Sequence, residues 1–154
     1  MNKPKCIPYH SPFTKLRYEW QVGFCSPEHR GNTSITVWAT KNGAAKLQVV
    51  RKTFLGSAPR KFQVTKSLSA ELLHQLQQAF ANASLKFAVM PTFACDAGSS
   101  FLEASGDPWS FRLSYGTHEE EDGLEEFRER LREVYEPVLD AMNAKIREAM
   151  VATT

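Results

Sequence analysis

A strict alternation of apolar and polar residues near the N-terminus is the feature that most restricts how this chain can fold. The apolar members occupy every second position: Leu16, Tyr18, Trp20, Val22 and Phe24. Successive side chains of a β-strand point to opposite faces, so this pattern predicts a strand with one buried and one exposed face. Lys15 and Arg17 lie at intervening positions. The exposed face of this strand is therefore expected to be basic.

Three further strands are predicted to follow the first. Asn42-Gly43 separates the β-prone segments 33–40 and 46–54, and Asn-Gly favours a hairpin because both positions tolerate a positive φ. After a break rich in glycine, serine and proline, residues 61–66 are predicted to form a short fourth strand.

A helix is predicted after these strands, with two more strands behind it. Ser69 is suited to cap the helix, because a serine side chain accepts a hydrogen bond from a backbone N–H of the first turn. The apolar stripe of the helix consists of Leu72, Leu73, Leu76 and Phe80. Segments 100–104 and 109–115 then flank a Ser-Gly-Asp-Pro turn and are predicted as a second hairpin.

The last predicted element is a long helix from about residue 121 to 150. Apolar residues recur every three or four positions at Leu124, Phe127, Leu131, Val134, Val138, Met142 and Ile146. Pro137 removes one backbone hydrogen bond, so a kink or break is expected there. Because the stripe extends well past Pro137, part of it is expected to lie beyond the sheet. This predicts a homodimer through the C-terminal helix.

The resulting order is ββββ-α-ββ-α, which predicts an α+β fold. Tight hairpins imply an antiparallel sheet of about six strands, and two helices with single apolar stripes imply that both pack on one face. The expected architecture is an open-faced two-layer sandwich formed by one domain over residues 14–150. Residues 1–13, with three prolines, are expected to form an extended N-terminal arm.

Charge is divided unevenly along the chain. Residues 1–66 contain twelve basic and two acidic residues, a formal charge of +10, whereas residues 67–154 contain seven basic and fifteen acidic residues, a charge of −8. We expect the basic part on the outward positions of the first four strands and the acidic part on the last helix. No apolar run approaches the roughly 20 residues of a membrane span. An odd number of cysteines, three, suggests a reducing, cytoplasmic location.

The outward strand positions are the predicted binding surface. Its members are Lys15, Arg17, Trp38, Lys46, Gln48, Lys52, Lys61 and Arg112. Such a surface suits an acidic protein partner, which predicts a small non-enzymatic binding protein of the inhibitor, immunity or regulatory type. The alternative is a module for single-stranded nucleic acid, with phosphates on the basic side chains and a base stacked on Trp38.

Cysteine and histidine supply the remaining candidate chemistry. Two Cys-x3-His pairs, Cys6 with His10 and Cys25 with His29, contain four possible zinc ligands. A strand about 30 Å long separates the two pairs, so free thiols are the preferred interpretation. An enzyme using Cys95 or such a zinc site is a second alternative. Neither a catalytic residue nor a cofactor is predicted.

Overall fold

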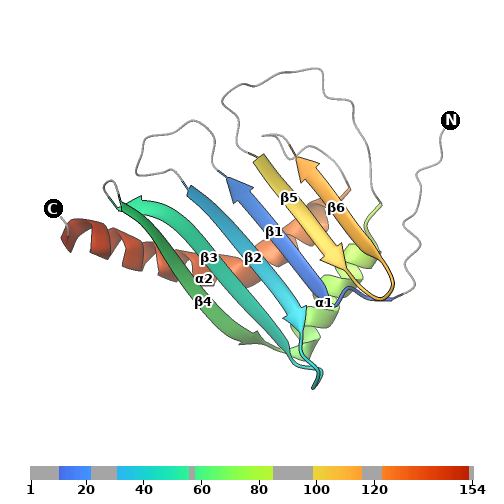
Figure 1. Cartoon of the computed structure of the whole chain (residues 1–154). Helices are drawn as coiled ribbons and strands as arrows, with labels where there is room; N and C mark the ends of the chain where they lie inside the picture. The colour runs from blue at the N-terminus through green and yellow to red at the C-terminus, as the bar shows by residue number, and fades with distance from the viewer. Residues whose placement is uncertain (1–10, 22–30, 56–57, 85–98, 116–122, 153–154) are drawn as a thin grey trace, which may run out of the picture.

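The computed structural model describes residues 11–21, 31–55, 58–84, 99–115 and 123–152. The strands are β1 (Lys15–Gln21), β2 (Gly31–Ala39), β3 (Ala45–Leu55), β4 (Ala58–Leu68), β5 (Ser99–Ser105) and β6 (Ser110–Tyr115), and the helices are α1 (Ala70–Ala81) and α2 (Glu125–Ala152). All six strands form one antiparallel sheet in the order β4-β3-β2-β1-β5-β6. The predicted α+β class and element order are confirmed (Figure 1).

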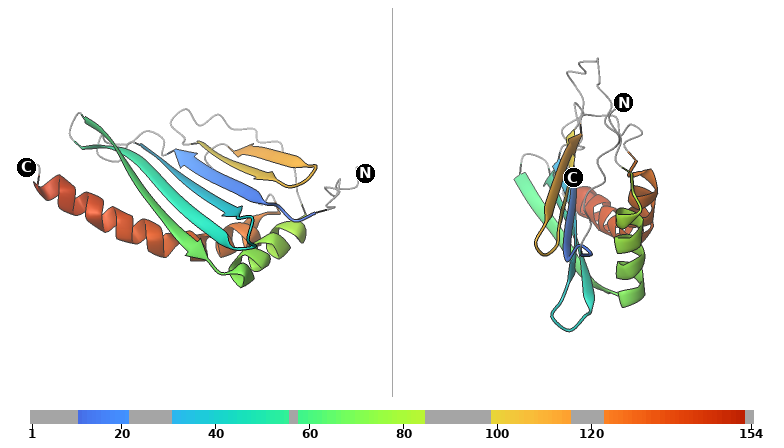
Figure 2. Two further views of the ribbon diagram at one scale, coloured as in Figure 1. Left: turned by 60° about the horizontal axis from the view of Figure 1, so that its bottom comes forward. Right: turned by 90° about the vertical axis from the view of Figure 1, so that its right-hand side faces the viewer.

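Both helices lie on the same side of the sheet. Figure 2 shows the two layers edge-on, with α1 and α2 together behind one face and no described element over the other. The strands alternate in burial as the sequence predicts, since apolar residues of β1, β2 and β3 face the helices. The open-faced two-layer sandwich is therefore the observed architecture.

The core lies between the sheet and the helices. Its fully buried members include Leu16, Ile35, Val37, Leu47, Val49 and Leu102 from the sheet and Leu76, Phe127 and Leu131 from the helices. Burying a side chain of this size contributes about 1.5–3 kcal/mol. Phe13, at the end of the segment predicted as an arm, is also fully buried. Its ring meets Phe80 of α1 edge-on, with 5.8 Å between ring centroids.

The fourth strand differs from the prediction. Instead of a short strand over residues 61–66, β4 has eleven residues and pairs with β3 along its whole length. Pro59 lies within it. Proline donates no backbone hydrogen bond, but β4 is an edge strand and one of its sides needs no partner. The sequence rule that ended the strand at proline was wrong for this reason.

Helix α1 begins as predicted but presents a narrower apolar stripe. The Ser69 hydroxyl accepts a hydrogen bond from the Leu72 backbone N–H, which confirms the N-cap. Leu73, Leu76 and Phe80 are buried, whereas the Leu72 side chain is 38% exposed. Successive helical residues are rotated by about 100°, so Leu72 and Leu73 do not share the same face. Leu72 does not belong to the predicted stripe.

Helix α2 begins later than predicted and is not broken by proline. Gly123, just before it, has a φ of 88°, which a right-handed helix cannot contain. The helix then continues without interruption through Pro137 to Ala152. Pro137 is exposed, and the carbonyl of Glu133, which loses its hydrogen-bond donor, is free to bind water.

The long β3–β4 pair covers the C-terminal half of α2. In Figure 1, α2 runs behind the sheet from the β5–β6 side to the β3–β4 side. Met142 and Ile146 are buried there, and Asn143 accepts a hydrogen bond from Arg51 of β3. Partial burial lowers the pKa of the Arg51 guanidinium. The stripe that suggested a homodimer is thus covered within the chain as far as Ile146. The homodimer stays a prediction, and the described part of the fold does not require it.

Gly31 provides a test of the sheet geometry. Its φ is 146°, and a Cβ added there would lie 2.0 Å from the carbonyl oxygen of Lys52 on β3. Gly43, in the β2–β3 turn, also has a positive φ but has open space around it. Gly43→Ala should lower the free energy of unfolding by about 1–2 kcal/mol, the cost of the conformation alone. Gly31→Ala should lower the free energy of unfolding by clearly more, because the added methyl group also meets the Lys52 carbonyl. Equal losses of the two variants in urea unfolding would contradict the close approach of β2 and β3 at Gly31.

Candidate interface on the open sheet face

The predicted binding residues project from the face that the helices leave uncovered. Register places Trp38 between Lys15 and Lys46 across three strands, and it places Lys52 directly opposite Lys61. Arg17, Gln48 and Arg112 occupy the same face by strand alternation. The sequence thus assigned the positions of these eight residues in the fold correctly, and their role in binding stays a prediction.

A hollow of about 670 Å³ lies on this face over β1, β2 and β3 and reaches Lys61 of β4. It is lined by Thr14, Lys15, Arg17, Glu19, Asn32, Ser34, Thr36, Trp38, Ala39, Gln48, Val50, Lys52 and Lys61. Of the predicted residues, Lys46 lies beside the hollow on the far side of Trp38, and Arg112 lies on β6, away from it. The hollow therefore includes six of the eight predicted binding residues and covers only part of the open face.

Four lysines at the hollow have no acidic partner among the described residues. They are Lys15, Lys46, Lys52 and Lys61. Lys52 and Lys61 also face each other across neighbouring strands, an arrangement in which like charges reduce sheet stability. Their ammonium groups are exposed and available to an anion.

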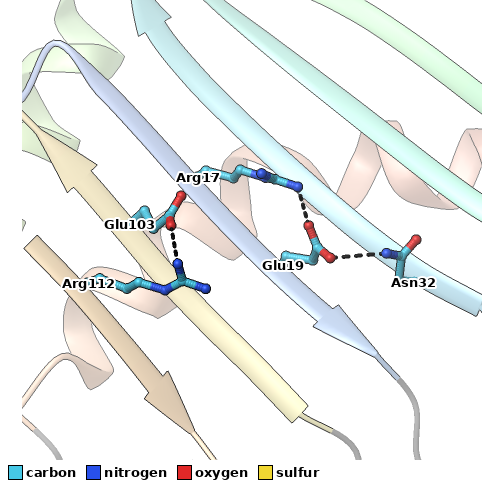
Figure 3. A network of polar contacts seen from close by, with 5 residues as sticks. All are labelled: Arg17, Glu19, Asn32, Glu103 and Arg112. Atoms are coloured by element: carbon cyan, nitrogen blue, oxygen red, sulfur yellow. Dashed lines mark hydrogen bonds and ion pairs between the residues drawn. The ribbon is translucent and has the colours of Figure 1, made fainter.

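The two arginines of the face, in contrast, are already engaged (Figure 3). Arg17 forms an ion pair with Glu19 at 2.5 Å, and the second carboxylate oxygen of Glu19 accepts a hydrogen bond from Asn32 at 3.0 Å. On the outer strands, Arg112 pairs with Glu103 at 3.2 Å. These pairs lie at the surface, so each contributes roughly 0–1 kcal/mol and mainly orients the side chains.

Phe101 is a further aromatic residue on this face, and the sequence pattern did not predict it there. The guanidinium groups of Arg17 and Arg112 lie over its ring, 5.3 and 5.1 Å from the centroid. Phe101 and Leu102 are adjacent in sequence and both apolar, so alternation alone did not decide which of them faces the core. The charged residue at position 103 was the available signal, since Glu103 shares a face with Phe101.

The face has a net positive charge with acidic groups inside it. The described strands present six basic and two acidic side chains on this side, a formal charge of +4. Three further basic residues of these strands, Arg51, Arg60 and Lys66, point to the helix side. The open face therefore carries less positive charge than the sequence predicted. Helix α2, with seven acidic and five basic residues, has a charge of −2. The two layers therefore differ in sign, as predicted, but less strongly than the sequence totals suggest.

The chain matches no known protein family and no curated protein. Nor does any group of three or more His, Cys, Asp or Glu side chains in the described ranges come together as a metal site would require. The zinc candidates Cys6, His10, Cys25 and His29, and the thiol of Cys95, lie outside those ranges. No helix in the part of the chain that the structure describes is long and apolar enough to cross a membrane.

The arginine contacts to Phe101 make a measurable prediction. Each cation–π contact at an exposed site contributes about 0.5–1 kcal/mol. Phe101→Leu keeps most of the apolar area but loses both contacts, so it should lower the free energy of unfolding by about 1 kcal/mol. In an Arg17→Met, Arg112→Met background the same substitution should have almost no effect. An undiminished loss in that background, measured by urea unfolding, would show that the arginines do not stabilise the ring.

Proposed function

We propose that this chain is a small non-enzymatic binding protein that engages an acidic protein partner through the hollow on its open sheet face. The observation that carries the proposal is the set of four lysines at the hollow, Lys15, Lys46, Lys52 and Lys61, none of which pairs with an acidic group among the described residues. Carboxylates of a partner would supply the missing counter-charges. Inhibitor, immunity and regulatory proteins work by this kind of surface recognition.

Acidic groups within the face favour a protein partner over nucleic acid. Glu19 and Glu103 lie between the basic residues, where they would repel a continuous phosphate backbone. A protein partner can place neutral or basic groups opposite them. The aromatic residues also favour a protein partner. Arg17 and Arg112 already cover Phe101, so among the side chains that the structure describes on this face only Trp38 is left as a stacking platform.

The polar groups of the hollow also favour binding over catalysis. Its carboxylate, Glu19, has one oxygen paired with Arg17 and the other bonded to Asn32. Each oxygen keeps a further lone pair, but the two contacts hold the carboxylate against Arg17 and Asn32. The described residues that line the hollow include no histidine, cysteine or second carboxylate to act with Glu19 in acid–base or nucleophilic catalysis.

The test is neutralisation of the four lysines together, as Lys→Gln at positions 15, 46, 52 and 61. A partner captured from the native host by the wild-type protein is first identified and purified, and its dissociation constant is then measured. An exposed charge contact contributes about 0.2–1 kcal/mol. At about 0.5 kcal/mol each, the loss of four contacts should weaken binding roughly 30-fold. Circular dichroism and urea unfolding establish that the variant is folded.

A matched control removes the same charge elsewhere. Lys66, Arg130, Lys145 and Arg147 are exposed and lie on the helix side of the molecule, and their joint replacement by glutamine should change the affinity less than threefold. Equal losses in the two variants would contradict a role for the hollow. Binding of a single-stranded oligonucleotide that falls steeply between 50 and 200 mM salt, and is lost only in the hollow variant, would establish the nucleic-acid alternative instead.

A further inference from the structure

The positive charges of the hollow are concentrated at its two ends. Lys52 and Lys61 pair across β3 and β4 at one end, and Lys15 lies beside Trp38 at the other, with Lys46 on the opposite side of the indole. Lys46 and Lys52 are six residues apart on the same strand. At about 3.3 Å per residue, the two ends are separated by roughly 20 Å along the strand direction.

The floor between the ends is neutral. Ser34 and Thr36 of β2 and Gln48 and Val50 of β3 form it. These are small or uncharged side chains, so a bound chain needs no charge over the middle of the hollow. The ion pair of Arg17 with Glu19 borders the floor on the β1 side.

We infer that the hollow binds an extended segment of the partner, aligned with β2 and β3, with an acidic side chain near each end and neutral residues between. This inference rests on the function proposed above and specifies the partner's chemistry. Two carboxylates about six residues apart in an extended chain match the roughly 20 Å between the lysine pairs. The segment would place one carboxylate between Lys52 and Lys61, where it would offset the repulsion of the two ammonium groups.

The polar floor of the hollow favours an extended chain over a helix. A helix satisfies its backbone hydrogen bonds internally, and one that spans roughly 20 Å needs about thirteen residues. An extended chain keeps its backbone N–H and C=O groups available along its length. Such a chain would bring these groups over Ser34, Thr36 and Gln48 of the floor.

A spacing series tests this inference. Fluorescein-labelled peptides of fifteen residues, identical in composition and rich in serine and threonine, differ only in the separation of two glutamates: two, six, nine or thirteen positions. Fluorescence anisotropy in low-salt buffer should show the tightest binding at a separation of six. A separation of two should bind about tenfold more weakly, because its two glutamates reach the lysine pair at only one end of the hollow. A flat profile would overturn the inference, and a maximum at thirteen would indicate a helical segment instead.

Variants at each end complete the experiment. Lys52→Gln with Lys61→Gln, and Lys15→Gln with Lys46→Gln, should each remove the preference for a separation of six, while the helix-side control variant keeps it. Failure here is distinguishable from failure of the proposed function. If no peptide binds but the purified partner still requires the four lysines, the hollow binds a protein and the extended two-ended segment is wrong.

Discussion

The pairing of β1 with both β2 and β5 is the constraint on which the rest of the molecule depends. β2, β3 and β4 form one run of hairpins, and β5 with β6 forms another. β1 joins the two through separate ladders, with Lys15 opposite Trp38 on one side and Ser105 on the other. Because side chains alternate along a strand, a slip of one residue in either ladder would turn lysines into the core and leucines into water.

That register also separates two kinds of charge on the open face. Charges near β5 and β6 are balanced: Arg17 and Arg112 have carboxylate partners and share the ring of Phe101. Charges around β3 and β4 are not balanced within the described residues, and they surround the hollow. The arginines are thus neutralised by carboxylates of the same face, whereas the lysines have no acidic partner among the described residues. The candidate site is therefore defined by where the unpaired charges lie and not by the total charge of the face.

Much of this arrangement was predictable from the sequence, because it depends on local patterns. The alternation in β1, the Asn-Gly turn and the Ser69 cap each have short-range physical causes, and together they determined the fold class and the outward positions of the lysines. The length of β4 was not predictable in this way, since proline is tolerated only where the strand is an edge, a property of the whole sheet. The burial of the C-terminal half of α2 was not predictable either, because it depends on the full length of the β3–β4 pair.

The site was harder to derive, because it depends on which outward residues neighbour one another. Alternation identified four lysines as exposed. Only the register shows that Lys52 and Lys61 face each other and that Trp38 lies between Lys15 and Lys46. Phe101 was missed because its neighbour Leu102 is equally apolar. Strand pairing links residues far apart in the chain, and no local pattern records it.

The opposed lysines have a consequence for the protein when nothing is bound. Lys52 and Lys61 repel each other across the β3–β4 ladder. This repulsion lowers the free energy of unfolding of the protein without a bound anion. Any anion held between them would recover that loss and would bind the folded chain more tightly than the unfolded one. The melting temperature of this protein should therefore rise with the concentration of such an anion, which makes thermal stability a direct readout of occupancy.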